Sequence, residues 1–154
     1  MKNNLKTIFA FFCIIILNNC GYAPLLDSKK INFYINDLNV SGDRQLVNLL
    51  TNKLEKFKNF NENAKEYNLD ISNNYEKVMV NKDSSGNPKN YNVVITTNVN
   101  IILKNQTKIE KIFVRKKSFE AQDRKIKEKE MEKKFKKDLA ELIGEDIVFF
   151  LMSQ

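Results

Sequence analysis

The apolar residues of this chain recur with two different periods, and the first of these predicts a strand close to residue 31. Residues 31–36 alternate apolar and polar side chains, which is typical of a strand with one buried face. Leu38 and Val40 fall on the opposite parity. We therefore expect either a β-bulge near Asp37 or the end of the strand at that point.

Two segments repeat their apolar residues at helical spacing instead. The first, over 43–58, follows Ser41-Gly42-Asp43, which supplies a turn and an N-cap. The second begins at Ala121, and its stripe consists of Met131, Phe135, Leu139, Ile143, Ile147 and Leu151. Each predicted helix therefore has one apolar side to bury.

Three further strands are predicted between these helices. Residues 67–80 contain two alternating stretches, and 81–88 form the strongest turn signal of the chain, so a hairpin tip is expected there. Residues 91–103 carry apolar or β-branched side chains at seven consecutive odd positions. Residues 108–119 complete the set as a strand whose facing is ambiguous, because its apolar positions do not hold one parity.

The order of these elements is β-α-β-β-β-α. Strands with one apolar face and helices with one apolar stripe bury these surfaces most simply against each other. The pattern predicts an α+β fold, a two-layer sandwich in which both helices pack on one face of a four-stranded, mostly antiparallel sheet.

The first residues of the chain have a different character. Residues 8–17 are an unbroken apolar run behind Lys2 and Lys6, which is typical of a secretory signal and too short for a bilayer span of about 20 residues. A buried N-terminal strand or helix is the alternative interpretation. The signal interpretation divides the chain into a signal peptide over 1–19, a short segment over 20–30 and a single domain over 31–154.

The segment Leu17-Asn18-Asn19-Cys20-Gly21 resembles the lipobox of bacterial lipoproteins. The resemblance implies that Cys20 carries a diacylglyceride and becomes the first mature residue, whereas Asn19 departs from the small residue usual before that Cys. An uncleaved anchor or a chance Cys is the alternative. Two acyl chains suffice for stable membrane anchoring. Gly21 resembles the sorting pattern that sends lipoproteins to the outer membrane.

Composition then excludes several functions. The 154 residues contain no His and two Cys, which excludes a catalytic triad with His and a four-thiolate zinc site, so we expect no enzyme, no metal and no cofactor. The net charge of +7 rests on 26 basic residues of which only three are Arg. Because Arg is the residue that forks onto phosphates and stacks on bases, and no RNA-binding aromatic motif is present, no nucleic-acid partner is predicted.

Short matches in the right order resemble the LPS-assembly lipoprotein family, LptE, also called RlpB. The matching segments are Cys20-Gly21-Tyr22-Ala23-Pro24-Leu25, Asp43-Arg44, Tyr67-Asn68-Leu69-Asp70, Tyr91-Asn92-Val93, Lys117-Ser118-Phe119 and Asp138-Leu139-Ala140-Glu141. The resemblance spans nearly the whole mature chain, although no single motif is specific to the family.

This resemblance implies a lipid-anchored protein on the periplasmic side of the outer membrane. Such a protein plugs and assists the LptD β-barrel and takes part in lipopolysaccharide transport. It also implies lipopolysaccharide contacts near the hairpin tip and near the start of the last helix. The matching regions offer Lys77, Lys82 and Lys89 at the tip, and Arg124 and Lys125 at the helix.

Two alternatives stay open. The lysines are also explained as solubilising residues on a Lys-rich surface, since the chain holds 23 Lys and 22 Asn. The protein as a whole is also explained as a periplasm-facing envelope lipoprotein that acts as a protein-binding scaffold and binds no lipopolysaccharide.

Overall fold

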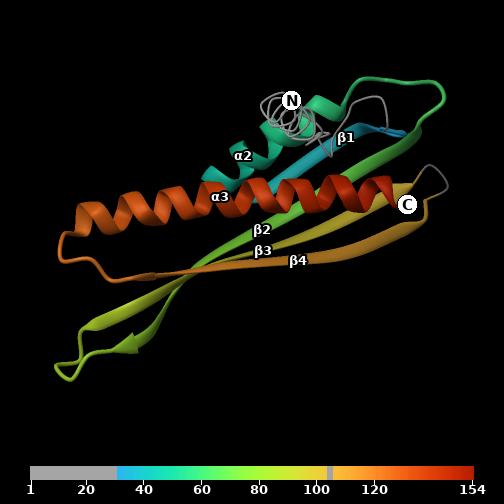
Figure 1. Cartoon of the computed structure of the whole chain (residues 1–154). Coiled ribbons are helices and arrows are strands. Elements are labelled where there is room, and N and C mark those ends of the chain that lie inside the picture. The colour runs from blue at the N-terminus through green and yellow to red at the C-terminus, as the bar shows by residue number, and fades with distance from the viewer. Residues whose placement is uncertain (1–30, 104–105) are drawn as a thin grey trace, which may run out of the picture. The chain divides into compact units, whose positions relative to one another are not determined.

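The computed structural model describes residues 31–103 and 106–154 (Figure 1). The predicted signal peptide, Cys20 and the 20–30 segment lie outside the described residues, as do positions 104 and 105. Residues 32–154 form one compact unit, and every element below belongs to it. Within the described residues, no helix is both long and apolar enough to span a membrane.

The observed element order is the predicted β-α-β-β-β-α. The elements are β1 (Phe33–Gly42), α2 (Arg44–Leu54) with the short 3-10 turn η2 (Glu55–Phe57), β2 (Lys65–Lys82), β3 (Pro88–Leu103), β4 (Lys108–Glu120) and α3 (Lys125–Met152). The first helix thus ends at Leu54, short of the predicted residue 58, and the last begins at Lys125 rather than Ala121.

The four strands form one mixed sheet in the order β1-β2-β3-β4. β1 runs parallel to β2, to which it connects through α2, and the other two pairs are antiparallel. Both helices lie on the same side of the sheet (Figure 1). They pack closely, since a Cβ added at Gly144 of α3 would meet the side chains of Lys53 and Leu50 on α2. The predicted α+β sandwich is therefore confirmed.

The core lies between the sheet and the two helices. Alternate residues of β2 and β3 point into it and are almost inaccessible, as the pattern of odd positions predicted. The buried strand residues include Tyr67, Leu69, Ile71, Val93, Ile95, Val99 and Ile101, and the helices contribute Leu46, Leu50, Leu54, Leu139, Ile143, Ile147 and Leu151.

β1 resolves the first of the open alternatives in favour of a bulge. Its register against β2 shifts between Ile35 and Asp37, and the strand continues to Gly42. The extra residue returns Leu38 and Val40 to the buried parity. Asp43 then caps α2, because its carboxylate accepts from the backbone N–H groups of Gln45 and Leu46.

For two strands, β2 and β4, only the structure shows on which face of the sheet their apolar side chains lie. β2 keeps one parity from Ile71 to Met79, so Val78 lies exposed on the helix-free face of the sheet. Val80 stands at a register shift between Met79 and Asn81 and is exposed as well. In β4, Phe113 packs against Phe150 of α3, whereas Ile112 and Val114 are exposed. The ambiguous pattern of 108–119 thus reflects apolar residues on both faces.

Candidate functional site

The hairpin tip, residues 81–89, extends beyond the rest of the sheet. The last pair between β3 and β4 joins Asn90 to Glu120, whereas β2 and β3 continue to the pair of Lys82 and Pro88. In Figure 1 the tip extends away from α3 and from the rest of the sheet. No element of the described residues covers it, so its shape depends on its own turn.

Asp83 holds that turn. Its carboxylate accepts from the backbone N–H groups of Ser85 and Asn87 at 2.9 and 2.8 Å. The backbone hydrogen bond from Asn87 is the main cause that holds the pKa of Asp83 below its ordinary value. Gly86 completes the turn with a φ of 85°, in the left-handed region that favours glycine.

An open hollow of about 550 Å³ lies at the base of this turn. This tip hollow is lined by Lys82, Asp83, Ser84, Pro88, Lys89, Glu120 and Ala121. The structure thus brings together two of the predicted site lysines, Lys82 and Lys89. It also places the carboxylates of Asp83 and Glu120 beside them, so the charges of the lining side chains balance.

Arg124 and Lys125 lie close to the tip hollow in the chain but do not line it. The connection from β4 to α3 starts at the hollow, since the backbone N–H of Ala121 donates to the carbonyl of Lys89 at 2.9 Å. Arg124 then precedes α3 and Lys125 is its first residue; both are exposed. The start of α3 and the tip lie at the same end of the domain (Figure 1).

Lys77 occupies a different environment from the other predicted site residues. Its ammonium forms ion pairs with Glu128 and, at 3.2 Å, with Glu132 of α3. The same nitrogen lies 4.2 Å from the centre of the Tyr91 ring. Its side chain is 22% exposed, so Lys77 joins β2 to α3 and does not lie at the tip.

These pairs belong to a polar network between the sheet and the helices. The Tyr75 hydroxyl donates to Glu132, and the Lys136 ammonium binds Asp43 at 2.9 Å. The Lys136 nitrogen also lies 3.7 Å from the centre of the Tyr75 ring. We call this set, formed by Asp43, Tyr75, Lys77, Glu128, Glu132 and Lys136, the polar network.

The polar network shifts the ionisation of its members. Partial burial alone would raise the pKa of Glu132, but hydrogen bonds from Tyr75 and Lys77 lower it below its ordinary value. Burial would likewise raise the pKa of Asp43, and the hydrogen bond from Lys136 and two backbone N–H groups lower it. Burial would lower the pKa of Lys77, and the two glutamates raise it. Glu132, Asp43 and Lys77 are therefore charged at neutral pH.

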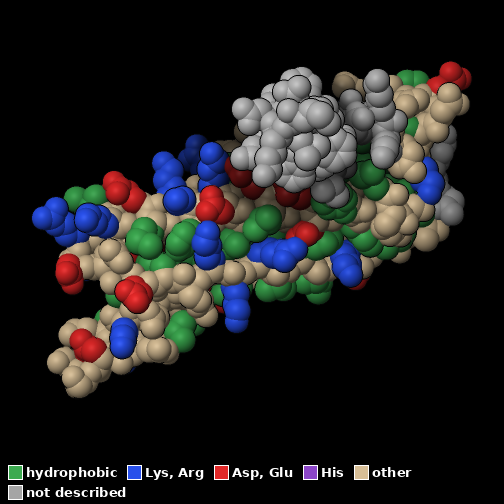
Figure 2. Space-filling model, in the orientation of Figure 1, with side chains coloured by type: hydrophobic (Ala, Val, Ile, Leu, Met, Phe, Trp, Pro, Cys, Tyr) green, Lys and Arg blue, Asp and Glu red, His purple; other side chains and the backbone are tan. Residues whose placement is uncertain are grey.

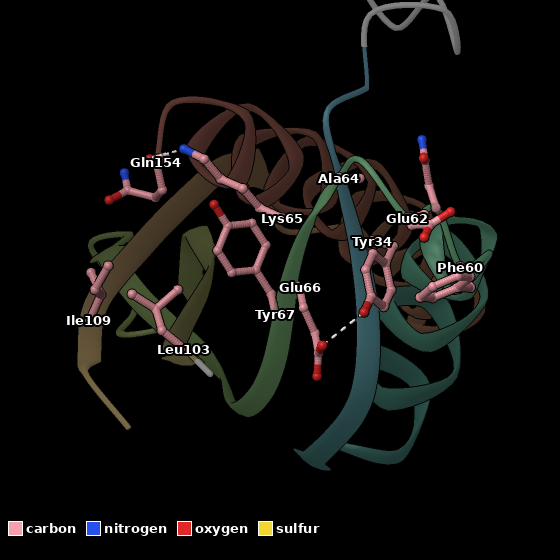
Figure 3. Close-up of a pocket in the computed structure, with 11 residues that line it drawn as sticks. Tyr34, Phe60, Glu62, Ala64, Lys65, Glu66, Tyr67, Leu103, Ile109 and Gln154 are labelled. Atoms are coloured by element: carbon pink, nitrogen blue, oxygen red, sulfur yellow. Dashed lines mark hydrogen bonds between the residues drawn. The ribbon is translucent and has the colours of Figure 1, made fainter. Parts of the chain in front are cut away.

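A second hollow, of about 640 Å³, is drawn in Figure 3. It lies at the end of the sheet opposite the hairpin tip, where β2 begins at Lys65 and β3 ends at Leu103. Aromatic and aliphatic side chains line it together with the polar residues Asn61, Glu62, Lys65, Glu66 and Gln154. The buried hydroxyl of Tyr67 has no hydrogen-bond partner among the described residues, and burial raises the pKa of this phenol. At its rim, Tyr34 donates to Glu66 at 2.8 Å. This end of the domain combines apolar surface with a phenol donor.

The described residues contain no group of three or more Cys, Asp or Glu side chains arranged to hold a metal ion. The tip hollow contains two solvent-accessible ammonium groups on adjacent strands. Such an arrangement attracts anions weakly and with little geometric selectivity, because Lys is a mobile point charge.

Three features of these sites were not predicted from the sequence. Glu120 enters the tip hollow only through the register of β3 and β4. The pocket around Tyr67 joins segments that no motif connects. The position of Lys77 did leave a signal, because Lys77 shares the odd parity of the buried residues Tyr67 and Ile71.

Solved structures of other proteins share the fold of this chain. No protein-family model matches the sequence, and no curated protein matches it. Among solved structures, the rare lipoprotein B of Shewanella oneidensis is similar, with a TM-score of 0.57 and 16% identity over 76% of this chain and 95% of that one. The minor lipoprotein of Acinetobacter baumannii aligns with a TM-score of 0.53 and 16% identity, over 77% of this chain and 92% of that one.

Lipoprotein B of Nitrosomonas europaea is also similar, with a TM-score of 0.53 and 15% identity over 84% of this chain and 92% of that one. The shared fold extends over nearly the full length of these three proteins. The chain thus has the fold of these lipoproteins, as the LptE resemblance of its sequence implied.

Proposed function

We propose that this protein is an outer-membrane lipoprotein of the LptE type, which plugs and assists an LptD-like β-barrel and takes part in lipopolysaccharide transport. The observation that carries the proposal is the agreement of two independent features. The sequence presents a lipobox-like segment ending at Cys20, and the domain that follows has the fold of solved lipoproteins, rare lipoprotein B among them.

The anchor in this proposal is a diacylglyceride on Cys20. About 0.8 kcal/mol per buried methylene makes two chains sufficient to hold the domain at the membrane surface. The Cys20→Ala variant is expected to remain unprocessed or soluble and to take up no labelled palmitate. Palmitate labelling that persisted in this variant would contradict the assignment of Cys20 as the lipidated residue of a lipoprotein.

The role in the barrel requires no chemistry at a reactive side chain, and we propose no enzymatic activity. We propose that Lys82 and Lys89, supported by Arg124 and Lys125, contact the phosphates of lipopolysaccharide. Support comes from their exposure at one end of the domain, with solvent access at the tip hollow. Lys77 is assigned no direct contact, because two glutamates already bind its ammonium.

The decisive experiment is purification of the full chain from membranes after mild detergent extraction. We expect a large β-barrel protein to co-purify. A second arm measures binding to lipopolysaccharide micelles, and the Lys82→Ala/Lys89→Ala variant is expected to bind several-fold more weakly. Lys56→Ala/Lys58→Ala, exposed positions at the end of the first helix, is the matched control.

The protein-binding scaffold is the second candidate, and the charge balance of the tip hollow favours it. Asp83 and Glu120 offset the two lysines there, so a dianionic phosphate gains less than it would from an uncompensated cation pair. Absence of the barrel, together with micelle binding that is insensitive to Lys82 and Lys89, would establish the scaffold in place of the LptE-type role.

A further inference from the structure

β4 is an edge strand with an open backbone edge. The strand order places it at the end of the sheet, and no strand within the described residues pairs with its outer side. β4 is 13 residues long, so it presents an extended row of backbone N–H and C=O groups. Such an edge is a template for another strand unless side chains block it.

Exposed apolar side chains lie on both sides of this edge. On the helix-free face, Ile112 and Val114 are 62% and 58% exposed. On the helix face, α3 contributes Leu142 and Phe149, which are 46% and 39% exposed. Four of the nine large hydrophobic residues found exposed in the described part of the chain therefore flank one strand.

The contacts of α3 fix the direction of these two helix residues. Asp138 binds Lys117 at 3.2 Å, and Asp146 binds Arg115 through two hydrogen bonds. Leu142 lies one turn after Asp138 and one turn before Asp146, so it faces the same side of β4. Phe149 continues this stripe one turn later. In Figure 2, hydrophobic side chains follow the boundary where α3 lies over β4.

Charge distinguishes between the possible occupants of this edge. Residues 111–117 carry four cations and no carboxylate. Arg115 and Lys117 are neutralised by α3, whereas neither Lys111 nor Lys116 forms an ion pair with the described carboxylates. A second copy that paired antiparallel through β4 would bring two such cationic segments together. An acidic segment would meet opposite charge instead.

We propose that the β4 edge receives a strand from a partner protein, an extended segment with an apolar centre flanked by acidic residues. Its backbone continues the sheet beyond β4, and its central side chains contact Ile112 and Val114 on one face and Leu142 and Phe149 on the other. Its acidic ends lie near Lys111 and Lys116. This surface is separate from the tip hollow and does not depend on lipopolysaccharide binding.

The test uses the full protein and a short fluorescent peptide with a valine- and threonine-rich centre between glutamate pairs. Fluorescence anisotropy is expected to show saturable binding, about tenfold tighter than that of the same peptide with lysine pairs. Methylation of alternate backbone nitrogens is expected to abolish binding, because it removes the ladder hydrogen bonds. Amide exchange of β4 should slow when the unmethylated peptide is bound.

The matched protein variants are Ile112→Glu/Val114→Glu and Val78→Glu/Val80→Glu. Both pairs are exposed valine or isoleucine positions, but the second pair lies on β2, away from the β4 edge. Only the first variant is expected to lose the peptide, with both showing the circular dichroism of the parent protein. The assay contains no lipopolysaccharide and no barrel protein, so its result is independent of the function proposed above.

Three outcomes would overturn the proposal. Absence of saturable binding, or equal binding of the N-methylated peptide, excludes strand addition. An equal loss of peptide binding in the Val78→Glu/Val80→Glu variant would show that the peptide does not bind specifically at the β4 edge. A dimer of the protein alone in sedimentation, lost in Ile112→Glu/Val114→Glu, would assign the edge to a second copy of this chain.

Discussion

The covered part of the β2–β3 pair and its hairpin tip belong to the same two strands, but different interactions hold them. In the covered part, alternate side chains are inaccessible beneath α2 and α3, and the polar network joins β2 to α3. At the tip, the lysines are exposed and the turn depends on one carboxylate, and Val78 and Val80 just before the tip are exposed as well. The same residue types therefore stabilise the fold in one region and remain available for contacts in the other.

Two glycines with positive φ test this contrast most strongly. Gly42 closes β1 at φ 112°, and a Cβ there would lie 2.0 Å from the backbone oxygen of Asn73. Gly86 at the tip has φ 85° with open space around it. We expect Gly42→Ala to lower the free energy of unfolding by more than about 4 kcal/mol, and Gly86→Ala by about 1 kcal/mol.

Urea unfolding of both variants measures this difference, with the slope of the transition as a check on two-state behaviour. Equal losses in the two variants would mean that backbone strain alone, and not the close approach of β1 to β2, limits position 42.

A core residue and an exposed residue next to the tip give the next contrast. Ile143 is fully buried on α3, whereas Val80 is 51% exposed on the tip side of β2. Ile143→Ala is expected to cost about 3 kcal/mol, because it removes buried methyl groups and leaves a cavity. Val80→Ala is expected to cost less than about 0.5 kcal/mol. A large loss for Val80→Ala in thermal unfolding would show that this part of β2 is covered in solution.

Two lysines on β2 differ in the same way. Lys77→Met is expected to cost about 2 kcal/mol, since it leaves Glu128 and Glu132 without their shared cation in a partly buried position. Lys82→Met, at the exposed end of the strand, should leave stability nearly unchanged. Chemical unfolding at neutral pH checks both, and a neutral result for Lys77→Met would contradict the stabilising role of the polar network.

The element order was predictable because hydrophobic periodicity determines most of it. Seven odd positions define β3, a four-residue repeat defines α3, and Asp43 signals the start of α2. The side chains of β2 that point into the core were not predictable, because Lys77 has the parity of the buried residues whereas Val78 and Val80 do not. A partly buried cation at this position is explained only by the structure, which places Glu128, 51 positions later, beside it. Similarly, the turn signal predicted the hairpin tip and the LptE resemblance pointed to the lysines there, whereas Glu120 required the β4 register.

Acid provides the smallest and most selective test of the polar network. Folding lowers the pKa of Glu132 and of Asp43, so both bind protons more readily in the unfolded chain. Their contribution is fully present above the ordinary carboxyl pKa of about 4 and is lost as the pH falls through the lower folded values. Glu132→Gln is therefore expected to reduce the loss of unfolding free energy below about pH 5. This reduction is expected to be smaller than the loss of unfolding free energy that Lys77→Met causes at neutral pH. Glu130→Gln, on the exposed side of α3, is the matched control, and an equal flattening there would locate the acid sensitivity outside the network.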